Sequence, residues 1–190
     1  MIPYRLNPLG ISGGKPYQRE LAYLESTGQQ WIDTGVVSNN LSTRYDVDIA
    51  FTGQILQNGR CGLYTSAFGA YNSQWCCGNV YSGGAPVQRD VRYSLSCRNC
   101  QLYVDDVYVL QRVYSYTGAQ YMFASCNVNG QPQYTDYMRI FAAKIYVDGT
   151  LVRDFIPVLD NDSVPCMFDQ VTGTCYYNSG TGTFLYGELN

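Results

Sequence analysis

Histidine is absent from this sequence of 190 residues. Its absence excludes catalytic triads that use a histidine base and metal sites that use imidazole ligands. Charged residues are scarce too, at 14% of the chain with a net charge of −3. The 12 lysines and arginines are scattered and form no stripe that would neutralise a phosphate backbone. We therefore expect no nucleic-acid partner.

Long hydrophobic runs are also missing. No stretch approaches the roughly 20 apolar residues that a membrane helix needs, so we expect no transmembrane segment. Residues 1–20 contain Pro3, Arg5, Pro8 and Gly10, which interrupt any apolar core of signal-peptide length. We therefore expect synthesis in the cytoplasm, without a standard export signal.

Tyrosine and glycine are abundant instead, with 19 residues of each. Tyrosine combines an apolar ring with a polar hydroxyl, which suits half-buried strand faces and wet recognition surfaces. Residues 44–51 (RYDVDIAF) place apolar side chains at every second position, and this alternation predicts a half-buried strand.

Two short segments predict β-hairpins. Asp148 and Gly149 separate two apolar runs, as in a hairpin with a type I′ turn. Residues 102–109 show the same pattern, with Asp106 in the place of Gly149. Many short strand patterns, frequent turn signals and the lack of an amphipathic helix predict an all-β fold, namely an antiparallel two-sheet β-sandwich.

The chain divides at about residue 19. Residues 1–19 are rich in proline and glycine and lack periodicity, which predicts an extended N-terminal arm or linker. The strand patterns fill residues 20–190, which predicts one β-sandwich domain. A domain of this size buries enough surface to form a core without disulfides.

The eight cysteines are expected to be reduced thiols, because a disulfide framework requires a secretory context. Cys97 and Cys100, together with the adjacent Cys76 and Cys77, offer four thiolates. A vicinal pair suits tetrahedral zinc poorly, however, so we expect no metal site and no cofactor.

The strand register of a predicted hairpin indicates how far apart the last two cysteines, Cys166 and Cys175, lie. A hairpin closed by residues 170–173 places Phe168 opposite Cys175 and leaves Cys166 diagonal to Cys175. A diagonal pair lies beyond ordinary disulfide reach, so we expect two thiols in a core.

Carboxylates are weak candidates for catalysis or calcium binding. Asp46 and Asp48 are neighbours on one strand face, where solvated surface is the favoured interpretation over a glycosidase pair. Residues 160–162 (DND) supply only a fragment of the six to eight oxygens that calcium takes, so turn chemistry is favoured there. We expect no enzyme activity.

Residues 67–84 (AFGAYNSQWCCGNVYSGG) are the strongest candidate for ligand binding. Sugar recognition uses flat aromatic faces for C–H surfaces and amides for hydroxyls, and this segment is rich in both. The candidate residues are Tyr71, Asn72, Gln74, Trp75, Asn79 and Tyr81. The alternative is that Trp75 and Tyr81 pack into the sandwich or an oligomer interface. Trp31 is expected in the core.

Three segments carry a resemblance to a known family. Residues 20–36, 139–160 and 164–184 resemble the opening, late and closing motifs of a concanavalin A-like, laminin-G-like jelly-roll domain. This domain type is abundant in phages and bacteria of the gut. The resemblance covers residues 20–187 and implies a lectin-like jelly roll used for adhesion, glycan binding or virion structure.

A sandwich with an arm and no catalytic constellation fits a non-enzymatic structural protein of a phage virion, such as a capsid decoration, head or tail fibre protein. The arm would dock on other virion proteins through Tyr4, Arg5, Leu6, Leu9 and Ile11. A tyrosine-rich surface of low charge suits association, so we expect a homo-oligomer, with a trimer as the working hypothesis. The alternative is a carbohydrate-binding module of a gut bacterium or phage whose main role is specific glycan recognition.

Overall fold

Strand β3 (Thr43–Phe51) shows how the sequence pattern becomes structure. The computed structural model describes residues 15–53, 60–63, 67–82, 86–112, 115–127 and 129–189. It buries Tyr45, Val47 and Ile49 on one face of β3, and it leaves the charged residues between them on the other face, as the alternation predicts. Every regular element among the described residues is a β-strand, so the all-β prediction is confirmed.

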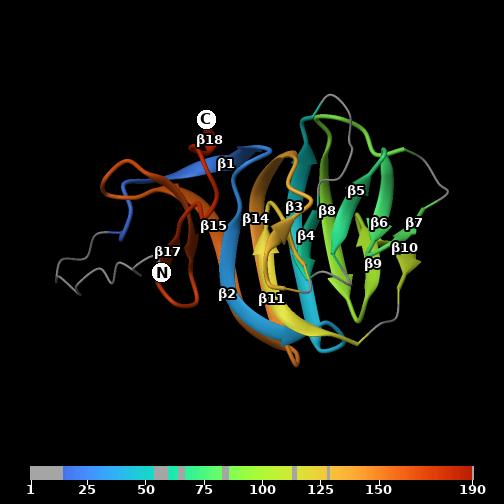
Figure 1. Cartoon of the computed structure of the whole chain (residues 1–190). Coiled ribbons are helices and arrows are strands. Elements are labelled where there is room, and N and C mark those ends of the chain that lie inside the picture. The colour runs from blue at the N-terminus through green and yellow to red at the C-terminus, as the bar shows by residue number, and fades with distance from the viewer. Residues whose placement is uncertain are drawn as a thin grey trace.

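A large sheet forms one layer of the molecule (Figure 1). Its strands follow the order β10 (Val107–Gln111), β9 (Gln101–Val104), β8 (Arg92–Arg98), β3, β14 (Tyr137–Val147), β1 (Arg19–Thr27), β15 (Thr150–Leu159), β16 (Pro165–Asp169) and β17 (Thr174–Tyr176). The last strand, β18 (Leu185–Glu188), pairs with β1. All of these pairings are antiparallel.

Strand β1 lies in a fork between β14 and β15. Near their shared turn β14 and β15 pair directly, from Val147 and Thr150 up to Ala143 and Phe155. Beyond that point the two strands diverge, and β1 pairs with β15 at one end and with β14 at the other. Because β18 also pairs with β1, a strand near each end of the chain lies in the middle of this sheet.

The second layer covers the inner face of the large sheet (Figure 1). It consists of a two-stranded sheet and a six-stranded sheet in the order β13-β12-β4-β5-β6-β7, which we call the small sheet because it is smaller than the first layer. The first contains β2 (Ile32–Asn39) and β11 (Thr117–Met122), and the second contains β13 (Pro132–Gln133), β12 (Ser125–Cys126), β4 (Arg60–Leu63), β5 (Phe68–Tyr71), β6 (Gln74–Cys77) and β7 (Val80–Tyr81). The pairing of β12 with β4 is parallel, and the strands form three sheets, so the prediction of a wholly antiparallel two-sheet sandwich is wrong in these two respects.

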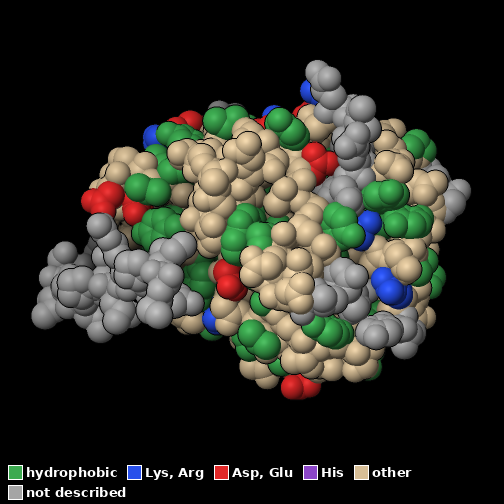
Figure 2. All heavy atoms as spheres, viewed as in Figure 1, with side chains coloured by type: hydrophobic (Ala, Val, Ile, Leu, Met, Phe, Trp, Pro, Cys, Tyr) green, Lys and Arg blue, Asp and Glu red, His purple; other side chains and the backbone are tan. Residues whose placement is uncertain are grey.

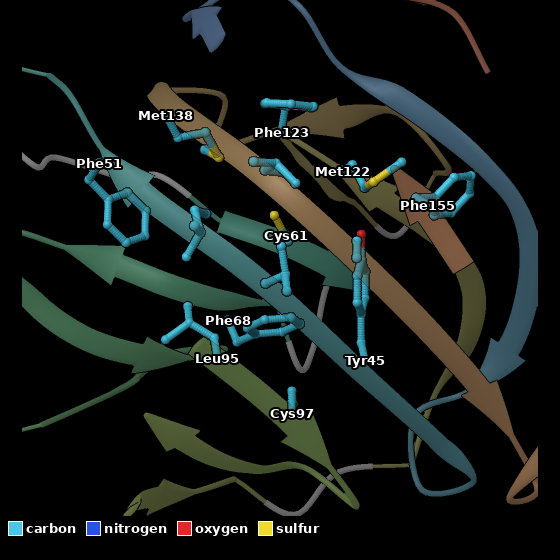
Figure 3. Packing of buried hydrophobic residues seen from close by; sticks show 14 of the residues in the cluster. Tyr45, Phe51, Cys61, Phe68, Leu95, Cys97, Met122, Phe123, Met138 and Phe155 are labelled. Carbon is cyan, nitrogen blue, oxygen red and sulfur yellow. The ribbon is translucent and has the colours of Figure 1, made fainter. Parts of the chain in front are cut away.

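The core lies between the two layers (Figure 3). Tyr45 of the large sheet meets Phe68 of the small sheet edge-on, with ring centroids 5.3 Å apart. Phe51 meets Trp75 in the same way at 6.3 Å. The hydroxyl of Tyr45 donates a hydrogen bond to the backbone oxygen of Tyr121, so the ring is fully buried with its polar atom satisfied.

Both predicted hairpins are present. Asp148 and Gly149 have φ values of 49° and 78°, as a type I′ turn requires, so the hairpin of β14 and β15 is confirmed. Asp105 and Asp106 have φ values of 49° and 63° between β9 and β10. Asp106 therefore adopts the left-handed conformation that glycine adopts at the corresponding position of the other hairpin, where the lack of a Cβ avoids strain.

Contacts of the sandwich begin before residue 20. The ring of Tyr17 is buried, with its centroid 5.0 Å from that of Phe168. The backbone N–H of Gln18 donates to the backbone oxygen of Leu159 at 2.9 Å, and β1 starts at Arg19. The predicted docking residues Tyr4, Arg5, Leu6, Leu9 and Ile11 lie outside the described residues.

Few charged side chains appear on the face shown in Figure 2, where they are scattered among hydrophobic side chains and the remaining atoms. Within the part of the chain that the structure describes, no helix is long and apolar enough to cross a membrane.

Candidate functional site

Two consecutive tight turns position the predicted ligand-binding residues. Asn72 and Ser73 connect β5 to β6 with φ values of 47° and 60°, and Gly78 begins the turn to β7 with a φ of 59°. In this register Tyr71 pairs with Gln74, and Tyr81 pairs with Cys76. Side chains at these positions share the face of the small sheet that points away from the core.

Tyr71 and Tyr81 form an aromatic pair on this face. Their ring centroids are 4.8 Å apart and their planes are inclined by 32°. Tyr81 is 41% exposed, whereas Tyr71 is half-buried. We call these two residues the tyrosine platform, because together they present aromatic surface to solvent.

Arg60 contacts the Tyr71 ring of the tyrosine platform. Its Cζ lies 5.4 Å from the ring centroid of Tyr71 and 4.4 Å from that of Tyr134, and its Nη1 donates to the backbone oxygen of Gly78 at 2.6 Å. Arg60 is only 4% exposed and forms no ion pair with a carboxylate among the described residues. A buried guanidinium between two rings fixes their positions through cation–π contacts.

Amide side chains surround the platform. Asn72 and Gln74 are exposed beside Tyr71, and Asn79 is exposed two residues before Tyr81. Each amide offers two donors and one acceptor oxygen, which match the hydroxyl groups of a sugar. The surface therefore combines the aromatic and amide groups that the sequence pattern predicts.

Trp75 is a core side chain and lies apart from this surface. It is 8% exposed, and its ring meets that of Tyr93 edge-on at 4.8 Å. Its backbone N–H donates to Ser82 Oγ, and its oxygen accepts from the Ser82 N–H. The accessible candidate residues are therefore Tyr71, Asn72, Gln74, Asn79 and Tyr81. Trp31 is half-buried and packs on Tyr121.

Sequence reasoning missed Arg60 and Tyr134. Arg60 begins β4, shortly before residues 67–84, whereas Tyr134 follows β13 and lies far from them along the chain. Each lacks a local motif that marks it, and only the pairing of the small sheet brings them under Tyr71.

The eight cysteines are free thiols in the structure. Phe168 pairs with Cys175 in the ladder of β16 and β17, so the predicted register is confirmed. A hydrogen bond between the thiols of Cys166 and Cys175, together with burial, raises the pKa of Cys166, and the same bond lowers the pKa of Cys175. No cluster of three or more potential metal ligands occurs among the described residues.

The carboxylates considered above for catalysis or calcium binding form ion pairs and hydrogen bonds within the protein. Asp46 pairs with Arg44, and Asp48 pairs with Arg92, on the outer face of the large sheet. One oxygen of Asp160 accepts the N–H groups of Asp162 and Val164, and the other accepts the Tyr177 hydroxyl. The bond from the Asp162 N–H, two residues after Asp160, is that of an Asx turn.

Comparison with known proteins finds no match: no family model fits the sequence, and no curated protein or solved structure is significantly similar to it.

Proposed function

We propose that this chain is a non-enzymatic structural protein of a phage virion that displays a lectin-like jelly-roll sandwich, and that the tyrosine platform is its contact surface for glycans. The observation that carries the glycan part is the Tyr71–Tyr81 pair, with centroids 4.8 Å apart and the Tyr81 ring exposed. The virion setting and the jelly-roll topology are supported by the resemblance of residues 20–36, 139–160 and 164–184.

Rigidity supports a binding role for the platform. Tight turns fix both ends of β6, and Arg60 fixes the ring of Tyr71 by contacts on Tyr134 and Gly78. A surface that is already ordered loses little conformational entropy when it binds a ligand. Aromatic rings contribute apolar area to the C–H face of a sugar at low entropic cost.

A glycan array with the full chain, with and without calcium, tests the binding role. We expect specific binding that falls by about tenfold or more in Tyr81→Ala, because the exposed ring is lost. The matched control is Tyr186→Ala on β18, since Tyr186 is 40% exposed and Tyr81 is 41% exposed. Binding that survives Tyr81→Ala, or no binding to any glycan, would overturn the role of the platform.

Deletion of residues 2–14 tests the virion setting separately. This deletion keeps Tyr17, which packs on Phe168 and belongs to the folded part. We expect the shortened chain to retain its thermal unfolding midpoint and to be missing from purified phage particles. Undiminished incorporation would refute docking through the arm. A full chain that is found in no particle, yet binds glycans, would favour the alternative of a dedicated glycan-binding module.

A further inference from the structure

A second surface with binding chemistry lies on the large sheet. A cleft of about 340 Å³ is lined by residues of the β2–β3 turn, the β8–β9 turn and the β14–β15 hairpin. In Figure 1 these turns lie at the lower edge of the molecule. Its lining includes Arg44, Arg98, Asn99 and Tyr146, and we call it the arginine cleft. Its volume is at the lower end of the range of small-molecule sites, about 300 to 1,000 Å³.

The ladder places two positive charges side by side in this cleft. Arg44 of β3 is the direct Cα partner of Arg98 of β8, and on its other side Arg44 pairs with Tyr146 of β14. Like charges directly opposite each other destabilise an antiparallel pair. An anion bound between or beside the two guanidinium groups would remove this repulsion.

Only one of the two arginines has an acidic partner in the described structure. Arg44 forms a bidentate pair with Asp46, with Nη2–Oδ2 and Nε–Oδ1 distances of 2.7 and 2.9 Å. Arg98 stacks instead on the ring of Tyr103, with its Cζ 3.8 Å from the centroid, and forms no ion pair with a described carboxylate. Stacking fixes the plane of the guanidinium and leaves its donors for a planar acceptor such as a carboxylate.

Neutral polar groups complete the lining. Asn99 occupies the first position of the β8–β9 turn with a φ of 51°, and its amide borders the cleft. Ser42 Oγ donates to the Asn39 oxygen and keeps acceptor capacity, and the Ser42 oxygen accepts the Asp148 N–H, which holds the hairpin tip in place. The cleft thus presents an amide, a hydroxyl and the ring of Tyr146 around one uncompensated cation.

We propose that the arginine cleft binds a sugar residue that carries a carboxylate, such as a uronic acid, with Arg98 as the partner of the carboxylate and Asn99 and Ser42 as partners of ring hydroxyls. The inference rests on the proposed function in that the ligand is taken to be a glycan. The site is nevertheless separate, because the cleft belongs to the large sheet and the tyrosine platform to the small sheet.

Amide chemical shifts of the ¹⁵N-labelled full chain, titrated with glucuronate, glucose and acetate, test this proposal. Glucuronate is expected to shift the amides of Asn99 and Gly149, which line the cleft, and to bind at least about tenfold more tightly than glucose or acetate. Glucose lacks the carboxylate and acetate lacks the ring, so both parts of the recognition are examined.

Three variants assign the contact. Arg98→Met is expected to weaken glucuronate binding by about tenfold or more. Arg98→Lys keeps the charge but loses the planar fork, so its affinity for glucuronate is expected to lie between those of Arg98→Met and the unmodified protein. Arg89→Met is the control, because Arg89 is an exposed arginine that precedes the opposite end of β8. It is expected to bind as the unmodified protein does.

Several results would overturn the proposal. They are equal binding of glucuronate and glucose, equal binding of glucuronate and acetate, the absence of shifts at Asn99 and Gly149, or unchanged binding in Arg98→Met. Glucuronate binding that Tyr81→Ala abolishes and Arg98→Met preserves would place the acid on the tyrosine platform. That result would refute the cleft and leave the proposed function intact.

Discussion

The tyrosine platform and the arginine cleft use the same pair of residue types in opposite ways. In the platform, Arg60 is 4% exposed and lies among Tyr71, Tyr134 and the Gly78 carbonyl. In the cleft, Arg98 covers Tyr103 at 3.8 Å and borders open space. Burial decides the role: a guanidinium enclosed by rings stabilises its neighbours, whereas one stacked at the edge of a cleft keeps donors for a ligand.

Among the single substitutions, replacing Arg60 is expected to have the largest effect on stability. Arg60→Met removes a charged hydrogen bond to the Gly78 oxygen and the cation between two rings, so the free energy of unfolding should fall by about 2 to 3 kcal/mol. Urea denaturation measures the change. A loss below about 0.5 kcal/mol, the range of ordinary surface substitutions, would remove the distinction between the two arginines.

Alkaline pH should weaken the small sheet through its buried thiols. Burial raises the pKa of Cys61 on β4 and of Cys76 on β6 from 9.0 to about 12. The unfolded chain therefore loses these protons first, so the stabilising contribution is fully present below about pH 9 and is lost as the pH rises toward 12.

The free energy of unfolding at pH 8 and pH 10.5 measures this effect. Each such thiol contributes a slope of about 1.4 kcal/mol per pH unit inside the window. In the double variant Cys61→Ala, Cys76→Ala the free energy of unfolding should therefore decline less steeply with pH than in the unmodified protein. Some decline should persist, because the other buried thiols remain in the variant. Parallel declines in the two proteins would contradict the prediction.

A substitution in the turn of the β9–β10 hairpin is expected to change the free energy of unfolding less. Asp106 adopts a φ of 63° in the turn from β9 to β10, a conformation that glycine adopts with little strain. Asp106→Gly should raise the free energy of unfolding by about 0.5 to 1 kcal/mol. Gly149→Ala, at a φ of 78°, is the reciprocal change and should lower it by a similar amount. Thermal denaturation of both variants checks the signs, and equal signs would refute the explanation.

The smallest change in stability is expected for Arg98→Met. This substitution removes one of two like charges at paired positions on β3 and β8 and keeps an apolar stem over Tyr103. The free energy of unfolding should change by less than about 0.5 kcal/mol, with a small gain as the favoured direction. Measured beside Arg60→Met in the same urea titration, it sharpens the contrast. A loss of 2 kcal/mol or more would assign Arg98 a structural role.

Local patterns in the sequence were sufficient for several features. The strand at residues 44–51 and the turns at Asp148–Gly149 and at residues 170–173 were predicted, because alternation and turn chemistry act between near neighbours. The exposed residues Asn72, Gln74, Asn79 and Tyr81 and the half-buried Tyr71 were predicted for the same reason, since tight turns in a polar segment keep side chains at or near the surface.

Trp75 could not be assigned from such patterns. It shares a four-residue strand with Gln74, and alternation alone does not say which face the second layer covers. Packing against Phe51 and Tyr93, from distant strands, places the indole in the core.

The sequence by itself determined the all-β character of this protein and the turns at residues 105–106, 148–149 and 170–173, because turn and strand conformation depends on residues a few positions apart. Only the tertiary structure decided which arginines are enclosed and which are open. Arg60 meets Tyr134, and Arg98 meets Arg44, through strand pairings that join residues 54 to 74 positions apart. Cross-strand register and the covering of one sheet face by another set the burial of these charges, and their chemistry follows from that burial.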